Sequence, residues 1–154
     1  MNAPRETIAK DPDFERRVRA SFAKQTIMET IGARLEHVAP GETEIVLEMS
    51  PGILQQHGFV HAGVVATIAV SAAGYAALSL MPPGAGVLTA EFKINLMAPA
   101  AGDRLIARGS VVKAGRTLTV AQAVVEAETG GTRRTVALLT ATLMAMENRE
   151  GILD

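Results

Sequence analysis

The chain has 154 residues, a formal net charge of −1 and no cysteine. This length suits a single domain, 1–154, whose core we expect to span about residues 12–146. The lack of cysteine excludes disulfides and thiol nucleophiles. The balanced charge gives no reason to expect binding of nucleic acid or of an anionic membrane surface.

The N-terminal part of the chain is charged and helical in pattern. Residues 1–24 carry many charges, so they do not resemble a secretory signal, and we expect a cytoplasmic protein. Apolar residues at helical spacing over residues 11–31 predict an amphipathic helix that ends at Gly32. Two strands are predicted next, at residues 33–38 and 42–49.

A long segment without charge occupies the middle of the chain, because no Asp, Glu, Lys or Arg occurs from Met49 to Ala90. Residues 51–61 read as a polar loop, and residues 62 to about 80 as a helix that Pro82 and Pro83 stop. The helix is long enough to suggest a membrane span. Its small residues and the lack of flanking basic clusters favour a buried helix of a globular protein, with no membrane.

The remainder of the chain predicts strands. They span residues 87–97, 104–113, 117–128 and 132–146, with turns between them, and the polar tail beyond Glu147 is expected to fray. One very apolar helix among meandering strands implies an α+β layer. We therefore expect an antiparallel sheet wrapped around one long central helix, with an additional N-terminal helix.

The loop before the central helix carries a motif. Gln55 is followed by Gly58, His61 and Gly63, and this spacing resembles the active-site loop of the PaaI-like thioesterases of the hotdog superfamily. Their loop has Asn or Gln, then Gly three residues later, then His-Gly-Gly. The stretches 87–100 and 112–118 are also similar to that family. The resemblance covers about residues 12–146 and implies a hotdog fold and acyl-CoA thioesterase activity.

The chain departs from the family pattern at two positions. Ala62 replaces the first glycine of the His-Gly-Gly triplet, which preserves the backbone N–H. Val70 stands nine residues after His61, where similar enzymes have an acid. Valine can neither accept a proton nor attack a thioester, so the residue expected to perform the chemistry is missing.

The loop and the helix start offer the other candidate catalytic groups. The N–H groups of Ala62 and Gly63 are natural oxyanion donors, and the Gln55 amide can donate to the thioester carbonyl or orient a water. His61 could act as a base, although the resemblance implies that it shapes the loop. His57 and His61 lack a third ligand within the uncharged segment, so no metal site is expected.

Three further groups of residues are candidates. Thr89 matches a position whose hydroxyl holds the water in similar proteins, and Glu91, expected on the same strand face, is an alternative base. Gly58 is a candidate substrate-binding residue of the loop. Lys113 and Arg116 flank a turn where they could bind the phosphates of coenzyme A, with Arg133 and Arg134 as a weaker alternative.

Two functions remain open from the sequence. The first is hydrolysis of an aryl- or medium-chain acyl-CoA to CoA and a carboxylic acid, weakened by Val70; coenzyme A belongs to the substrate, so no separate cofactor is expected. The second is non-catalytic binding or sensing of acyl-CoA. A dehydratase or hydratase ranks last because no acid accompanies a histidine along the helix.

The apolar strands also predict self-association. Strands 87–97 and 133–146 would leave a bare, aggregation-prone edge in a monomer. We therefore expect a homodimer joined edge to edge, or a dimer of dimers, in which Gln55 of one chain faces the helix of the other.

Overall fold

The computed structural model describes residues 7–152 and 154. The first six residues, part of the charged segment that argued against a secretory signal, lie outside this range. The described elements, in chain order, are α1 (Phe14–Lys24), α2 (Thr26–Ile31), β1 (Ala33–Ala39), β2 (Glu42–Glu48), the short 3-10 helix η1 (Pro51–Ile53), α3 (Ala62–Leu78), β3 (Gly86–Leu96), β4 (Arg104–Ala114), β5 (Leu118–Thr129) and β6 (Thr132–Met146).

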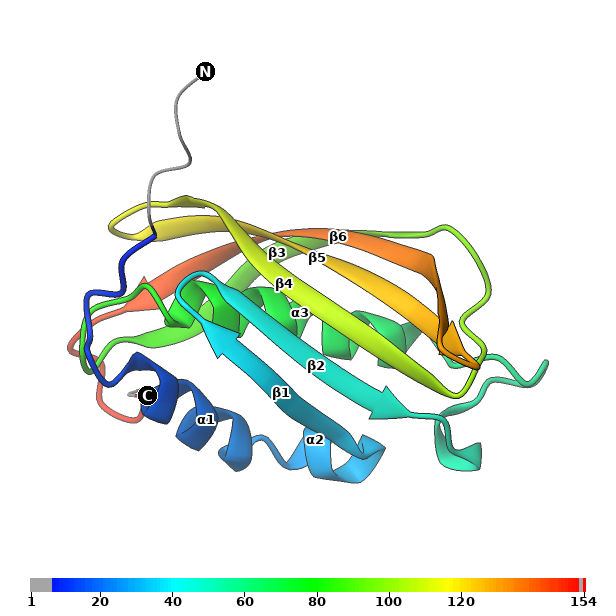
Figure 1. Ribbon diagram of the computed structural model, residues 1–154. Coiled ribbons are helices and arrows are strands. Elements are labelled where there is room, and N and C mark those ends of the chain that lie inside the picture. Colours follow the sequence, from blue (N-terminus) through cyan, green and yellow to red (C-terminus); the bar gives the residue numbers. More distant parts are fainter. Residues whose placement is uncertain (1–6, 153) are drawn as a thin grey trace, which may run out of the picture.

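The six strands form one antiparallel sheet in the order β1-β2-β4-β5-β6-β3. The sheet curves around α3, and α1 and α2 lie along the β1 side (Figure 1). Buried residues of β5 alternate with partly buried or exposed ones, as expected for a strand with one face on the core. The predicted α+β architecture, an antiparallel sheet wrapped around one long central helix, is therefore confirmed.

The sheet approaches the backbone of α3 very closely where β4 crosses it. A Cβ atom on Gly109 would lie 2.2 Å from the carbonyl oxygen of Ala72. The same carbonyl accepts a hydrogen bond from the Thr43 hydroxyl at 2.7 Å. Gly109 is therefore needed because no side chain fits between the strand and the helix.

Replacing Gly109 with alanine should lower the free energy of unfolding by about 1–3 kcal/mol or more, since the added methyl group must push β4 away from α3. Chemical denaturation measures this change. Gly52→Ala is the matched control, because a Cβ there meets no atom within 4 Å. Equal denaturation midpoints for the two variants would show that the close approach does not constrain the fold.

The predicted N-terminal helix is divided into two. Gln25 adopts an extended conformation, with φ −78° and ψ 94°, and separates α1 from α2. Val18 and Met28 are both fully buried. Each of the two short helices therefore contributes one of these side chains to the core. The predicted end at Gly32 is confirmed by its left-handed φ of 79°.

The burial of α3 differs from the expectation of a wholly buried helix. From Ala72 onward it is buried, but Val64, Ala66, Thr67, Val70 and Ser71 are only partly covered. The sheet covers the second half of the helix and leaves one face of the first half accessible. None of the helices described has both the length and the apolar character needed to cross a membrane.

The free edges of the sheet are also different from those expected. β6 lies between β5 and β3, so the expectation that residues 133–146 form a bare edge is wrong. The apolar edge is β3 alone, where Leu88, Phe92 and Leu96 are 45%, 45% and 52% exposed. An edge strand with such side chains is suited to pairing with another strand.

The polar tail does not fray, contrary to the prediction. Its described residues turn back toward α1 and the start of β3, where the Asp154 carboxylate accepts a hydrogen bond from the Ser21 hydroxyl at 2.6 Å. A local count of polar residues predicts an exposed tail, whereas these tertiary contacts hold it against the fold.

Candidate active site

The loop before α3 is held by a tight turn. The Gln55 N–H donates to the Phe59 carbonyl at 2.8 Å, and the Gly58 N–H donates to the Gln55 carbonyl at 3.0 Å. Gly58 has φ +83°, a conformation that favours glycine. Gly58 therefore shapes the turn, and it is not among the residues that line the two cavities beside α3.

His61 caps the N-terminus of α3. Its Nδ1 accepts a hydrogen bond from the Gly63 N–H at 2.9 Å. This bond uses the Nδ1 lone pair, so the neutral imidazole carries its proton on Nε2 and has no free nitrogen that could accept another. In this arrangement His61 orders the loop, and its Nδ1 is occupied by the Gly63 N–H.

The same bond changes which amide can stabilise an oxyanion. The sequence suggested both Ala62 and Gly63, but the Gly63 N–H is occupied by His61. The Ala62 N–H lies in the first helical turn, where no intrahelical acceptor exists, and it has no acceptor within the described part of the chain. No acidic residue occupies this first turn, so the positive end of the α3 dipole is not neutralised.

The Gln55 side chain is a second candidate donor, and it lines the same cavity as Ala62. Its Oε1 accepts a hydrogen bond from the His57 backbone N–H, which leaves the amide nitrogen to donate to a ligand. Gln55, His61 and Ala62 line a cavity of about 510 Å³, which we call the Gln55 cavity; Leu96 and Met97 form its wall at the end of β3. Two kinds of N–H donor are thus gathered around one space, as an oxyanion site requires.

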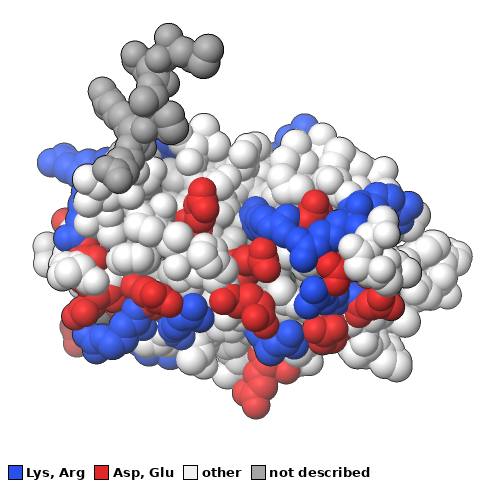
Figure 2. Space-filling model, viewed as in Figure 1, with Lys and Arg blue, Asp and Glu red and all other residues white. Residues whose placement is uncertain are grey.

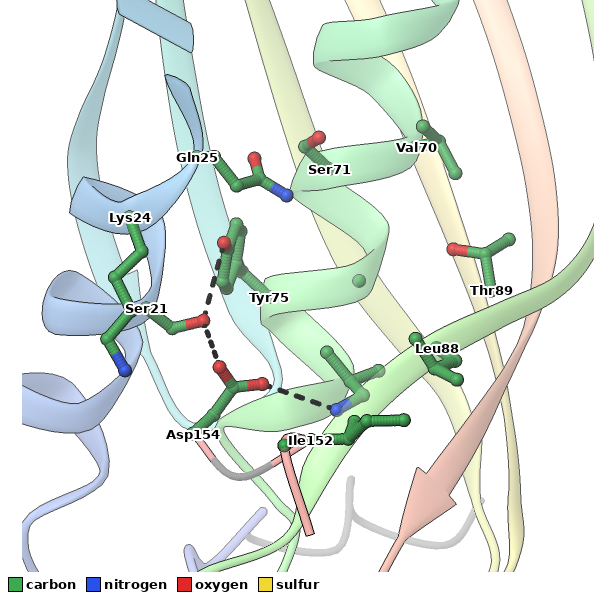
Figure 3. Close-up of a pocket in the computed structure, with 13 residues that line it drawn as sticks. Ser21, Lys24, Gln25, Val70, Ser71, Tyr75, Leu88, Thr89, Ile152 and Asp154 are labelled. Carbon is green, nitrogen blue, oxygen red and sulfur yellow. Dashed lines mark hydrogen bonds between the residues drawn. The ribbon is translucent and has the colours of Figure 1, made fainter. Parts of the chain in front are cut away.

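A second cavity, of about 540 Å³, lies farther along α3, and we call it the Val70 cavity. Val70 and Thr89 both line it, Val70 from the helix and Thr89 from β3 (Figure 3). The sequence did not indicate the other side chains that reach this cavity, because they come from α1 and from the tail. They include Ser21, Gln25 at the end of α1, Ile152 and Asp154, and Tyr75 of α3 lines the cavity beside them.

Tyr75 belongs to a small hydrogen-bonded group at this cavity. The Ser21 hydroxyl lies 3.5 Å from the Tyr75 hydroxyl and donates to Asp154 (Figure 3). Burial raises the pKa of the Tyr75 phenol above its usual value, and the nearby Asp154 carboxylate acts in the same direction. The phenol therefore stays neutral and serves as part of the wall.

Glu91 does not face the Val70 cavity, contrary to the expectation that it shares a strand face with Thr89. Thr89 pairs with Leu143, whereas Glu91 pairs with the adjacent Thr142. The unpaired Ala90 between them is a β-bulge, which reverses the faces that follow it. Glu91 instead accepts a hydrogen bond from the Thr142 hydroxyl at 2.6 Å, on the outer face, so it cannot replace the missing acid within this cavity.

The two cavities are separate within one chain. No residue lines both of them, and they lie beside opposite ends of β3, at Val87–Thr89 for one and Leu96–Met97 for the other. A single chain therefore does not bring Gln55 and Val70 into one site.

The candidate phosphate ligands differ in whether their side chains already donate hydrogen bonds within the chain. Lys113 and Arg116 are exposed near the β4–β5 hairpin. Arg133 donates to Glu128 at 2.7 Å. Acidic and basic side chains are mixed across the face seen in Figure 2. Arg134 donates to the Pro99 carbonyl at 3.0 Å. The hairpin residues are thus the more available pair.

Comparison with known proteins gives consistent matches. A family model described as the thioesterase superfamily matches residues 57–133, half of the chain. An esterase candidate from Halobacterium salinarum is 32% identical over 101 residues, which cover 62% of this chain and 66% of that protein. The alignment thus spans slightly less than two thirds of the archaeal protein.

Solved structures show the same relationship. A thioesterase family protein from Silicibacter pomeroyi is 50% identical, with a TM-score of 0.85 over 86% of this chain and 98% of that one. The PaaI protein from the phenylacetic acid degradation operon of E. coli is 19% identical, with a TM-score of 0.77 over 94% and 99% of the two chains. The second match shows similarity of fold.

Proposed function

The chain belongs to the thioesterase superfamily and has its hotdog fold, and on this basis we propose that it acts on acyl-CoA thioesters, releasing CoA and a carboxylic acid. The observation that carries the proposal is the Gln55 cavity, which is lined both by Ala62, whose N–H has no acceptor within the described chain, and by Gln55, whose amide oxygen is held by the His57 N–H. The family alone gives the class of reaction; these donors indicate where the carbonyl would be held.

The reaction follows from this arrangement. The thioester carbonyl oxygen accepts hydrogen bonds from the Ala62 N–H and the Gln55 amide, which stabilise the negative charge that develops when water attacks the carbon. The C–S bond then breaks, and CoA leaves as a thiolate. The proton lost by the water must pass to a base, and the expected position of that base is Val70.

Val70 makes the proposed hydrolysis weak. A general base commonly contributes about 10²–10⁴-fold to a rate, whereas the oxyanion donors do not depend on it. The same observation favours a second function, non-catalytic binding or sensing of acyl-CoA by a chain that retains the pocket. An aryl or a medium-chain acyl group suits the volume of about 540 Å³ in the Val70 cavity.

A panel of acyl-CoA substrates separates these two functions. Release of the CoA thiol can be followed with a disulfide reagent, because the chain has no cysteine to contribute background. Slow hydrolysis above the uncatalysed rate supports a thioesterase, and tight binding without hydrolysis supports the sensor. Absence of both binding and hydrolysis across the panel would refute the proposal.

A second copy of the chain would complete the site. Antiparallel pairing of two β3 edges about their middle would place the Val87–Thr89 end of one strand beside the Leu96 end of the other. The Val70 cavity of one copy and the Gln55 cavity of the other would then be neighbours. We propose that the active unit is this homodimer, alone or within a dimer of dimers.

Phe92→Lys should convert this dimer to a monomer. Phe92 is 45% exposed near the middle of β3, so pairing would bring two ammonium groups close together, and lysine at an edge opposes strand pairing. Light scattering coupled to size exclusion measures the mass. Val112→Lys is the control, because Val112 is 60% exposed but lies on β4, away from the edge.

The unmodified chain should itself have the mass of a dimer or of a dimer of dimers. A monomer at micromolar concentration would contradict the dimer proposal, and so would a Phe92→Lys variant that keeps the mass of the unmodified protein.

A further inference from the structure

The tail after β6 forms part of the Val70 cavity. Gly151, Ile152 and Asp154 line it together with residues of α1, α3 and β3. In the view of Figure 3, Val70 lies near the top of the drawn side chains, whereas Ile152 and Asp154 lie near the bottom. The tail therefore bounds the cavity at the end opposite the expected chemistry.

The tail occupies a fitted position. A Cβ atom on Gly86 would lie 2.8 Å from the Ile152 carbonyl oxygen and 3.0 Å from its Cγ2 atom, so only glycine at the start of β3 allows this contact. Asp154 accepts hydrogen bonds from the Ser21 hydroxyl at 2.6 Å and from the Val87 N–H at 3.4 Å. These contacts join the tail to α1 and to β3.

Gly74 also lines the Val70 cavity, and its lack of a side chain leaves the cavity wider there. It lies four residues after Val70, about 6 Å farther along the helix axis. No atom lies within 4 Å of a Cβ placed on it, and glycine inside a helix is less stable than alanine. Packing within the chain therefore does not require this glycine, while its missing side chain widens the cavity that it lines.

Two polar groups at this end, the Ser21 hydroxyl and the Asp154 carboxylate, are already paired with each other. Ser21 donates to Asp154 and lies beside the Tyr75 hydroxyl. Val87, Leu88 and Ile152 supply apolar wall. An apolar acyl group can therefore enter without stripping a partner from these hydroxyl and carboxyl groups.

Building on the proposed thioesterase function, we propose that the Val70 cavity holds an apolar acyl group that passes over Gly74 and ends against Ile152. Ile152 is then a specificity-determining residue that sets how long an acyl chain can be, and Gly86 positions it. Neither residue touches the reacting thioester.

Two variants should shift chain-length preference in the same direction. Ile152→Ala removes most of the side chain that ends the cavity. Gly86→Ala displaces Ile152, because the new methyl group overlaps the Ile152 backbone. Each variant should raise the affinity for decanoyl-CoA relative to butanoyl-CoA by about tenfold, as measured by isothermal titration calorimetry. Gly74→Ala should weaken binding of both ligands while raising the melting temperature, a combination that a purely structural role would not produce.

The controls separate a moved tail from a damaged fold. Val112→Ala removes an exposed apolar side chain that does not line the cavity. It should leave the ratio of the affinities for decanoyl-CoA and butanoyl-CoA unchanged. Tyr75 is the only tyrosine and the chain has no tryptophan, so tyrosine fluorescence reports whether the tail has moved. If a variant alters this fluorescence but keeps the wild-type ratio of the two affinities, the proposed role of Ile152 is refuted and the thioesterase function is not. Failure of the unmodified chain to bind either ligand would overturn the proposed function and this inference with it.

Discussion

Val70→Asp should raise the rate of acyl-CoA hydrolysis by about 10²–10⁴-fold, the usual contribution of a general base. Val70 is only partly buried and lines a cavity, so a carboxylate there remains accessible to water and is not stranded in hydrocarbon. Thr89 lines the same cavity and offers a hydroxyl that can hold the attacking water. The initial rate of CoA release, measured for both chains with the same acyl-CoA, tests this expectation.

Val70→Asn is the matched control for this gain. Asparagine has nearly the same size and polarity as aspartate, but its amide cannot accept the proton from water. It should leave the rate near that of the unmodified chain. Equal rates for the Asp and Asn variants would show that the missing base does not belong at position 70. Rapid hydrolysis by the unmodified chain would show that another group already serves as the base.

Ala62→Pro should lower the turnover number by about 10²–10³-fold, as loss of one oxyanion donor does in other enzymes. Ala62 is the first residue of α3, a position where proline suits the helix. His61 before it has φ −58° and ψ 136°, which proline also tolerates. The substitution therefore removes the N–H with little change to the backbone, and the Val70→Asp chain provides a rate high enough to measure the loss.

Ala62→Gly is the control, because it changes the side chain but keeps the N–H. It should retain the rate, and both variants should keep the melting temperature of their parent. If Ala62→Pro hydrolyses acyl-CoA as fast as Ala62→Gly, the oxyanion is held elsewhere and the proposed use of the α3 N-terminus is refuted.

Local patterns explain why much of the fold could be predicted from the sequence. The uncharged run of small residues placed α3, and period-two alternation with turn residues placed the strands within one or two positions. The spacing of Gln55, Gly58 and His61 identified the loop at the start of α3. The resemblance to the PaaI-like loop implies an acid nine residues after His61, and the sequence has Val70 there.

Features that depend on contacts between distant segments could not be read in this way. The bulge at Ala90 appears only when β3 is aligned with β6, and it alone turns Glu91 away from Thr89. The break at Gln25 separates two helices that each bury a core residue, Val18 in α1 and Met28 in α2. Likewise, nothing in the residues of the tail indicates that Gly86 would leave space for Ile152.

The difference between the features that the sequence predicts and those that only the folded structure shows has a physical basis. The sequence by itself determined the helix, the strands, the loop at the start of α3 and the presence of valine at position 70, because each follows from neighbouring residues. Only the tertiary structure decided that His61 occupies the Gly63 N–H and leaves that of Ala62, and that the Gln55 and Val70 cavities are separate. Hydrogen-bond partners and cavity walls depend on how the folded chain places its atoms, and here those walls come from α1, α3, β3 and the tail together.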